Sequence, residues 1–104
     1  MSIKDDKLKQ MVDFSNWRKI ANGSYCFAIS PNICYEIHIN IYKKSEHILK
    51  ANASLFIAGD CYDKNDIKFF YRKCLLEKQN VSECIKKAIQ HYKKEIKIEY
   101  GDKV

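Results

Sequence analysis

A chain of 104 residues can bury one hydrophobic core, so we expect a single domain spanning residues 1–104. Hydrophobic residues make up 46% of the sequence and charged residues 31%, a balance typical of a globular protein rather than a disordered one. No apolar run approaches the roughly 20 residues of a membrane helix, and the N-terminal residues lack the apolar segment of a secretion signal. We therefore expect a cytoplasmic protein with no membrane contact.

Lysine and arginine outnumber aspartate and glutamate by 19 to 13, which gives a formal net charge of +6. A basic balance attracts polyanions such as nucleic acids, and equally the acidic surfaces of other proteins. Arg18 and Arg72 are the two arginines, whereas proteins that read a nucleotide sequence rely mainly on arginine. The charge alone is therefore weak support for nucleic-acid binding.

The five cysteines do not form a recognisable framework. Their number is odd, their spacings contain no C-x-x-C pair and no secretion signal precedes them; they are Cys26, Cys34, Cys61, Cys74 and Cys84. Disulfide-stapled domains and structural zinc sites show even counts or paired spacings. We therefore predict reduced thiols, most of them buried.

Residues 4–21 are predicted to form the first helix. Asp5 and Asp6 place negative charge in its first turn, where the helix dipole favours it. Apolar residues recur at helical spacing, namely Leu8, Met11, Val12, Phe14 and Trp17. Asn22-Gly23 follows, and glycine is the usual residue at the left-handed position that ends a helix.

Two segments of alternating polarity come next and predict a β-hairpin. The short strand 25–29 is followed by a turn at 30–32 that contains Pro31. The strand 34–42 alternates strictly, with tyrosine and isoleucine at its odd positions. Its even positions, from Cys34 onward, are therefore predicted to point away from the core.

Alternation resumes over residues 49–57, after a polar connection at 43–46, and predicts a third antiparallel strand. Its inward row contains Ala51 and Ala53, which are small enough to let a helix approach the sheet. Gly59-Asp60 is expected to end this strand, and residues 61–65 are expected to form a loop.

Residues 67–78 fit two structures. Consecutive apolar residues, as in Leu75-Leu76, break the alternation of a strand. A helical stripe with Asp66 as N-cap accounts for more of the pattern; it consists of Ile67, Phe70, Tyr71, Cys74 and Leu75. We therefore predict a helix, with a fourth strand as the alternative.

The last helix is predicted from Asn80 onward. Asn80 is its N-cap, and Glu83 three residues later completes a capping-box arrangement. One face is apolar and consists of Val81, Cys84, Ile85, Ala88, Ile89 and Tyr92. Lysines occupy the rest of the helix, and the tail 99–104 is expected to fray.

These elements predict a small α+β fold in the order α-β-β-β-α-α. A three-stranded antiparallel sheet packs one face on the helices and turns the other to solvent. The residues expected on the solvent face are Glu36, His38, Asn40, Lys50, Asn52 and Ser54.

Catalytic chemistry is not predicted. Cys34 and His38 share a face with Glu36, and a Cys/His pair can act as nucleophile and base. Same-face neighbours on one strand, however, lie about 6–7 Å apart, further than a catalytic pair requires. The sequence contains no phosphate-binding glycine loop or catalytic motif, so an enzyme using Cys34 or His38 is the least favoured class. His38, His47 and His91 lie in different elements, so no metal and no cofactor is predicted.

Two surfaces are predicted to bind a partner. The first is the outward face around the central strand, with Glu36, His38, Asn40, Tyr42 and Lys50. The second is a positive ridge on the last helix, formed by Lys86, Lys87, Lys93 and Lys94 at heptad spacing. The chain is also rich in aromatic residues, and the candidates for exposure are Tyr42, Tyr62, Phe69, Tyr71 and Tyr92.

The lack of catalytic motifs predicts a non-catalytic, stoichiometric binding protein. Frequent Lys, Ile, Asn and Tyr are typical of AT-rich genomes, and compact chains of this kind are common in phages and mobile elements. We therefore expect an inhibitor of a host nucleic-acid-processing defence complex, of the anti-CRISPR type, whose partner is a nuclease or nucleoprotein complex. The alternative is a small basic protein that binds RNA or DNA directly.

Overall fold

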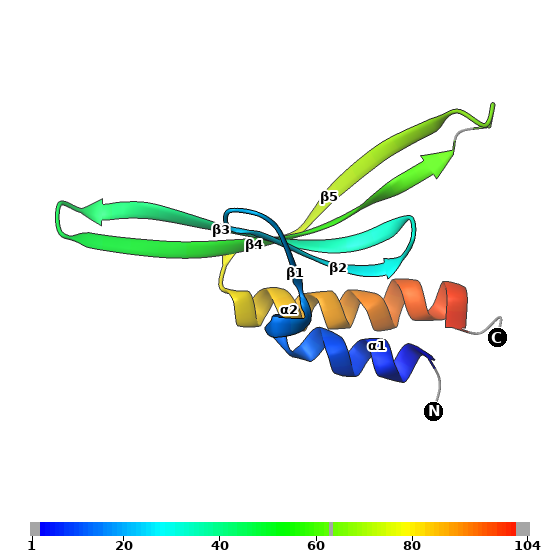
Figure 1. Cartoon of the computed structure of the whole chain (residues 1–104), viewed down its shortest axis with the longest axis horizontal. Coiled ribbons are helices and arrows are strands. Elements are labelled where there is room, and N and C mark those ends of the chain that lie inside the picture. Colours follow the sequence, from blue (N-terminus) through cyan, green and yellow to red (C-terminus); the bar gives the residue numbers. More distant parts are fainter. Residues whose placement is uncertain (1–2, 63, 102–104) are drawn as a thin grey trace.

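The computed structural model describes residues 3–62 and 64–101. Its elements are α1 (Ile3–Val12), the 3-10 helix η1 (Phe14–Asn16), β1 (Arg18–Ala21), β2 (Ser24–Ser30), β3 (Ile33–Ser45), β4 (Ile48–Tyr62), β5 (Lys68–Gln79), α2 (Val81–His91) and the π-helix η2 (Tyr92–Gly101). The strands form one antiparallel sheet in the order β1-β2-β3-β4-β5, so each strand pairs with the next along the chain. Both α-helices lie on the same face of this sheet (Figure 1).

The α+β class is confirmed, but the predicted three-stranded sheet and helix order understate the fold. The segments that form β1 and β5 were predicted to be helical, and these two strands extend the sheet to five strands. Within the described residues, no helix is long and apolar enough to cross a membrane.

The first helix ends at Val12, so the prediction of a helix reaching residue 21 is wrong. Asp13 caps η1, because its carboxylate accepts hydrogen bonds from the Ser15 backbone N–H (3.0 Å) and the Ser15 hydroxyl (2.8 Å). Asn16 donates its side-chain amide to the Gln10 carbonyl at 3.1 Å. Short polar side chains that form hydrogen bonds with nearby backbone groups compete with helical hydrogen bonds. Here they end the α-helix at Val12.

Asn22-Gly23 forms the hairpin turn between β1 and β2 instead of ending a helix. Ala21 pairs with Ser24 across it, and Gly23 has a φ of 74°, in the region that favours glycine. The Gly23 carbonyl also accepts a hydrogen bond from the Ile39 N–H at 2.6 Å. A Cβ on Gly23 would lie 2.7 Å from the Ile39 carbonyl oxygen, so β3 leaves no room for another residue.

The three predicted strands are confirmed as β2, β3 and β4, and each runs further than predicted. The segment 43–46 was expected to be a connection, but β3 continues through Ser45 and the chain reverses at residues 46–47. The polar residues there face solvent on both sides, so they give no alternation to recognise.

Gly59 lies inside β4 rather than at its end. Its missing side chain lets the turn between β2 and β3 come close, and the Asn32 carbonyl accepts a hydrogen bond from the Asp60 N–H at 2.9 Å. The strand continues to Tyr62, so the predicted loop at 61–65 begins later.

All but the first residue of the segment 67–78 belong to β5, so the helix prediction is wrong and the alternative of a further strand is right. Leu55 pairs with Leu76, but its neighbour Phe56 pairs with Cys74, which leaves Leu75 as the extra residue of a β-bulge. The bulge lets the consecutive residues Leu75 and Leu76 both pack against the core, and this breaks the alternation expected of a strand. Asp66, the predicted cap, has a φ of 62° and lies before the strand.

Asn80 is the N-cap of α2, as predicted, and its side-chain oxygen accepts a hydrogen bond from the Glu83 N–H at 2.8 Å. The apolar face of the helix is also confirmed, with Cys84, Ile85, Ala88 and Tyr92 buried and Val81 and Ile89 half-buried. After His91 the chain continues as a π-helix, which has more residues per turn than an α-helix. The tail 99–104 was expected to fray, but residues 99–101 belong to η2, and residues 102–104 fall outside the described part of the chain.

One core joins the helices to the sheet. Its largest fully buried side chains are Tyr35, Met11, Ile37, Leu55 and Cys84. Trp17 is also buried, and its indole N–H donates a hydrogen bond to the Met11 carbonyl at 3.0 Å. This hydrogen bond satisfies the indole N–H, which would otherwise be buried without an acceptor.

Two hairpins project from this core. The radius of gyration is 15.4 Å, compared with about 13 Å for a compact domain of 100 residues. The β3–β4 hairpin extends past the helices at one end, and the β4–β5 hairpin rises away from them at the other (Figure 1). The helices therefore cover only the middle of the sheet.

Candidate functional site on the outer face of the sheet

The face of the sheet opposite the helices carries the first predicted binding surface (Figure 1). Strand register places Glu36 between Cys26 of β2 and Phe56 of β4. The other predicted residues follow along β3 and across to β4, and they are His38, Asn40, Tyr42 and Lys50. The structure therefore brings all five residues onto one face, which we call the outer face.

Glu36 is buried although it lies on the outer face, with only 6% of its surface exposed. One carboxylate oxygen, Oε1, accepts a hydrogen bond from His38 Nε2 at 2.8 Å and pairs with the Arg72 guanidinium at 3.0 Å. A charged partner such as Arg72, together with the hydrogen bond to His38, offsets the penalty of removing a carboxylate from water. Glu36 thus links β3 to β5 across the intervening strand β4.

Ser24, His38 and Glu36 form a hydrogen-bonded chain. The Ser24 hydroxyl lies 2.8 Å from His38 Nδ1, on the other side of the ring from Glu36. A chain of serine, histidine and carboxylate is also the relay of hydrolases. Here the carboxylate also binds Arg72, and the hollow on this face is lined by Cys34 and Phe70 but not by Ser24 or His38. The arrangement is therefore suited to holding Arg72 in place.

Cys34 is not a ready nucleophile. Its Sγ lies 4.0 Å from Glu36 Oε2, and burial together with that carboxylate raises the pKa of the thiol to about 11. A thiol with such a pKa stays protonated near neutral pH, and the thiolate is the reactive form.

The other cysteines are free as well, within the part of the chain that the structure describes. Among the cysteines of that part, Cys84 is buried, Cys26 and Cys34 are half-buried and Cys74 is exposed, so fewer of the described thiols are buried than predicted. The side chain of Cys61 lies outside the described part.

Arg72 lies among aromatic rings. Its guanidinium carbon is 5.7 Å from the centroid of the Phe56 ring and 5.9 Å from that of Phe70, and the His38 ring meets Phe56 edge-on at 5.2 Å. The Arg72 side chain remains 47% exposed and Phe70 61% exposed. Together with Glu36, these four residues form what we call the arginine–aromatic patch.

No pattern in the sequence identifies three members of this patch. Phe56 was expected to lie on a strand without a role, and Phe70 and Arg72 were assigned to a helix. Positions i and i+2 share a face on a strand but not on a helix, so the pairing of residues 70 and 72 was invisible. Of the aromatic residues predicted to be exposed, Tyr42 is exposed, Tyr71 is half-buried and Tyr92 is buried, while the side chains of Tyr62 and Phe69 lie outside the described part.

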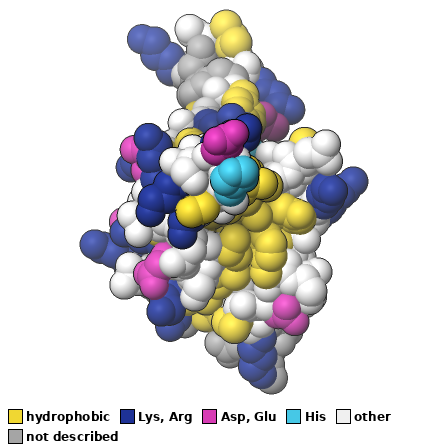
Figure 2. Space-filling view, turned by 90° about the vertical axis from the view of Figure 1, so that its left-hand side faces the viewer, with side chains coloured by type: hydrophobic (Ala, Val, Ile, Leu, Met, Phe, Trp, Pro, Cys, Tyr) yellow, Lys and Arg dark blue, Asp and Glu magenta, His cyan; other side chains and the backbone are white. Residues whose placement is uncertain are grey.

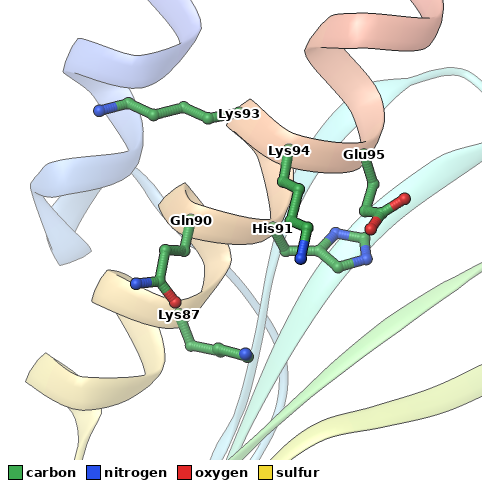
Figure 3. A pocket seen from close by; sticks show the side chains of 6 residues that line it. All are labelled: Lys87, Gln90, His91, Lys93, Lys94 and Glu95. Carbon is green, nitrogen blue, oxygen red and sulfur yellow. The ribbon is translucent and has the colours of Figure 1, made fainter.

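The second predicted surface, the lysine ridge, lies in the helix layer and not on the outer face. Three of its members line a hollow of about 560 Å³ at the junction of α2 and η2, with Gln90, His91 and Glu95 (Figure 3). Lys93 extends towards α1, whereas Lys94 extends towards His91 (Figure 3). The four lysines therefore do not form one straight ridge.

Two features explain the divided lysines. Heptad spacing aligns residues on an α-helix, but Lys93 and Lys94 lie on the π-helix, whose wider turn rotates them away from Lys86 and Lys87. Lys86 also pairs with Glu83 at 3.5 Å and borders a different groove.

His91 connects this hollow to the core. Its Nδ1 lies 2.7 Å from the Tyr35 hydroxyl, and the two rings meet edge-on. Burial lowers the pKa of His91 below 6.5, Glu95 opposes this effect, and Lys73 and Lys87 add to it. Burial also raises the pKa of Tyr35, so its hydroxyl keeps its proton and can donate a hydrogen bond to the neutral imidazole of His91.

The histidines do not assemble into a metal centre. Among the described residues, no three His, Cys, Asp or Glu side chains come together as a cluster that could hold a metal ion. His38 and His91 lie on opposite sides of the sheet, and His47 lies at the tip of the β3–β4 hairpin.

Comparison of the chain with protein-family models, with curated proteins and with solved structures finds no significant match.

Proposed function

We propose that this chain is a non-catalytic protein that binds a protein partner through the outer face of its sheet. The observation that carries the proposal is the arginine–aromatic patch, in which Glu36 and two phenylalanine rings hold an arginine that is still half exposed. Arginine and aromatic residues dominate the energetic centres of protein interfaces, and side chains held in place before binding lose less entropy.

The chemistry of the patch favours an acidic partner surface. Arg72 has five N–H donors, and Glu36 pairs with one of its terminal nitrogens, Nη2. The remaining donors can bind a carboxylate of a partner. Phe70 offers an apolar contact beside it, and Tyr42 and Lys50 extend the surface along the β3–β4 hairpin. The net charge of +6 attracts such a partner from a distance.

Direct nucleic-acid binding is supported less well. Proteins that bind single strands combine aromatic platforms with a positive groove on the same surface. Here the exposed Phe70 lies on the outer face, while Lys87, Lys93 and Lys94 lie in the helix layer. That the partner is a host nucleic-acid-processing complex stays a prediction from the sequence.

The test compares two variants of the tagged protein in affinity capture from candidate host lysates. Phe70→Ser removes an exposed side chain of the patch and leaves the core intact, because Phe70 is 61% exposed. The control variant, with Lys87, Lys93 and Lys94 changed to Gln, alters the helix layer with residues that also favour helices. Each capture is repeated after nuclease treatment and across a salt series.

We expect a partner that survives nuclease, is retained by the lysine variant and is lost from Phe70→Ser. A purified partner should then bind Phe70→Ser at least about tenfold more weakly, since central aromatic contacts contribute about 1.4 kcal/mol or more. Loss of all partners after nuclease, with an affinity that falls steeply with salt only while the lysines are present, would instead establish the nucleic-acid alternative.

A further inference from the structure

The β3–β4 hairpin continues well beyond the strands that flank it. The last pair between β2 and β3 is Ser24–His38, and the pairing of β4 with β5 ends at Ala53. Over residues 40–52 the two strands therefore have only each other as partners within the described sheet. We call residues 40–52 the arm, and both of its edges carry unpaired backbone groups.

The side of the arm that faces the helix layer carries exposed apolar residues, with Lys43 opposite Leu49 as the charged residue among them. Ile41 continues the row of Ile37, which is buried in the core, and Leu49 continues the row of Leu55. Ile41 is 68% exposed and Leu49 66% exposed, because the arm extends past the helices (Figure 1). We call this side the underside of the arm.

A groove in the helix layer lies at the same end of the molecule. It runs between the end of α1 and the start of α2, has a volume of about 740 Å³, and its apolar wall is made of Val12, Phe14, Val81, Ile85 and Ile89. Viewed from the end at which the arm projects, hydrophobic side chains gather below the arm and over the layer beneath it (Figure 2). Arm and groove therefore form two apolar walls of one open corner.

The exposed apolar surface of this corner is expected to be covered by a binding partner. An isolated two-stranded hairpin is marginal in water and usually needs a third strand or a packed face. A contiguous exposed apolar patch of this kind marks an interaction site in a soluble protein. The corner also lies on the opposite side of the sheet from the arginine–aromatic patch, so it is free when that patch is occupied.

We infer that the occupant of the corner is a second copy of this chain. Two copies related by a two-fold axis can associate reciprocally, with the underside of each arm seated on the groove of the other copy. Such an interface is self-complementary, because the arm and the groove that it needs are present on every chain.

Interface area favours this reciprocal arrangement over a single seated arm. The arm projects by about six residues per strand, or roughly 20 Å, and is about 10 Å wide. One arm on an unrelated surface buries on the order of 500 Å², whereas two arms that seat reciprocally bury about 1,000 Å², where specific interfaces begin.

The net charge of the chain predicts how dimerisation of two copies depends on salt. Each copy carries a net charge of +6, so two copies repel at long range while their apolar surfaces attract. Added salt should therefore strengthen self-association. Binding of an acidic protein to the outer face should weaken under the same conditions, which separates the two events.

Sedimentation velocity over about three decades of protein concentration tests the inference. The wild-type chain should pass from monomer to dimer, at lower concentration in about 500 mM than in about 50 mM NaCl. The double variant Ile41→Ser/Leu49→Ser alters exposed side chains outside the core and should raise the dimer dissociation constant at least about tenfold. Phe70→Ser is the matched control, an equally exposed apolar residue on the outer face, and should dimerise like the wild type.

A photo-cross-linking residue at position 41 locates the contact. In a mixture of isotopically light and heavy chains, mixed cross-links should join position 41 of one copy to residues 81–89 of the other. A chain that stays monomeric at every concentration, or a dimer that the arm variant does not weaken, would overturn the inference. Partner capture by the arm variant would still test the proposed function separately.

Discussion

At the scale of single residues, the position of Glu36 is the least expected feature of the molecule. Alternation along β3 predicts that Glu36 and His38 share a face, but about 6–7 Å separates such positions along a strand. The 2.8 Å contact forms because the His38 side chain leans back along the strand. Arg72 reaches Glu36 from β5, and its pairing partner on the intervening strand, Ala58, is small enough to leave room.

The first prediction concerns this buried carboxylate. Glu36→Gln keeps the shape of the side chain but removes its charge, and should lower the free energy of unfolding by about 1–2 kcal/mol. The loss stays below that of a fully buried ion pair because Arg72 is half exposed. Glu46→Gln, the same change at the exposed tip of the arm, should alter it by less than about 0.5 kcal/mol. Urea unfolding measures both, and equal effects would contradict a special role for Glu36.

The second prediction concerns pH. Burial lowers the pKa of folded His91 below its ordinary value of 6.5, so the unfolded chain takes up a proton before the folded one does. The stability that neutral His91 contributes is therefore present above pH 6.5 and is lost as the pH falls through 6.5 towards the lower folded pKa. Thermal melts should show a smaller loss over this range in His91→Gln than in the wild type. The same pH slope in both proteins would mean that His91 is not the group responsible.

At the scale of elements, α2 holds the helix layer on the sheet. The third prediction is that Ile85→Ala lowers the free energy of unfolding by about 2–5 kcal/mol, through lost burial and the cavity left behind. Lys86→Ala is the control, because Lys86 is well exposed beside it and should change stability by less than about 0.5 kcal/mol. Lys87 is unsuitable as a control, since it is half-buried at the hollow. Losses of similar size from both changes in urea unfolding would show that the faces of α2 are assigned wrongly.

The elements also show where sequence patterns succeed and where they fail. The middle of β3 and the face of α2 were predictable because each buries one side only, which leaves a clear period in the sequence. β5 was not, because a bulge at Leu75 puts two consecutive leucines against the core. β1 was not, because the helical spacing of residues 8–17 continues through Trp17, which packs on the core from outside any α-helix.

The outer face was predictable only within one strand. Residues on β3 could be assigned to it from their parity, without knowledge of their neighbours. The partners that complete the patch, Arg72 and Phe56, depend on the register between β3, β4 and β5. Register across three strands is a tertiary property that no short pattern in the sequence encodes.

At the scale of the whole molecule, the sheet separates two surfaces whose side chains differ in kind. Its outer face carries an arginine held among aromatic rings, while the helix layer carries lysines around the His91 hollow. The projecting arm adds an apolar underside at one end. We assign partner binding to the outer face, because Arg72 and the exposed Phe70 adjoin there.

The most direct test of this assignment is photo-cross-linking of the bound partner from defined positions. A photo-reactive phenylalanine analogue at position 70 preserves the ring on the outer face, and the same analogue at Gln90 samples the exposed helix layer. After nuclease treatment, irradiation should yield a covalent adduct with a protein partner from position 70 and none from position 90. An adduct from position 90 alone, or adducts with nucleic acid in place of protein when nuclease is omitted, would contradict the account.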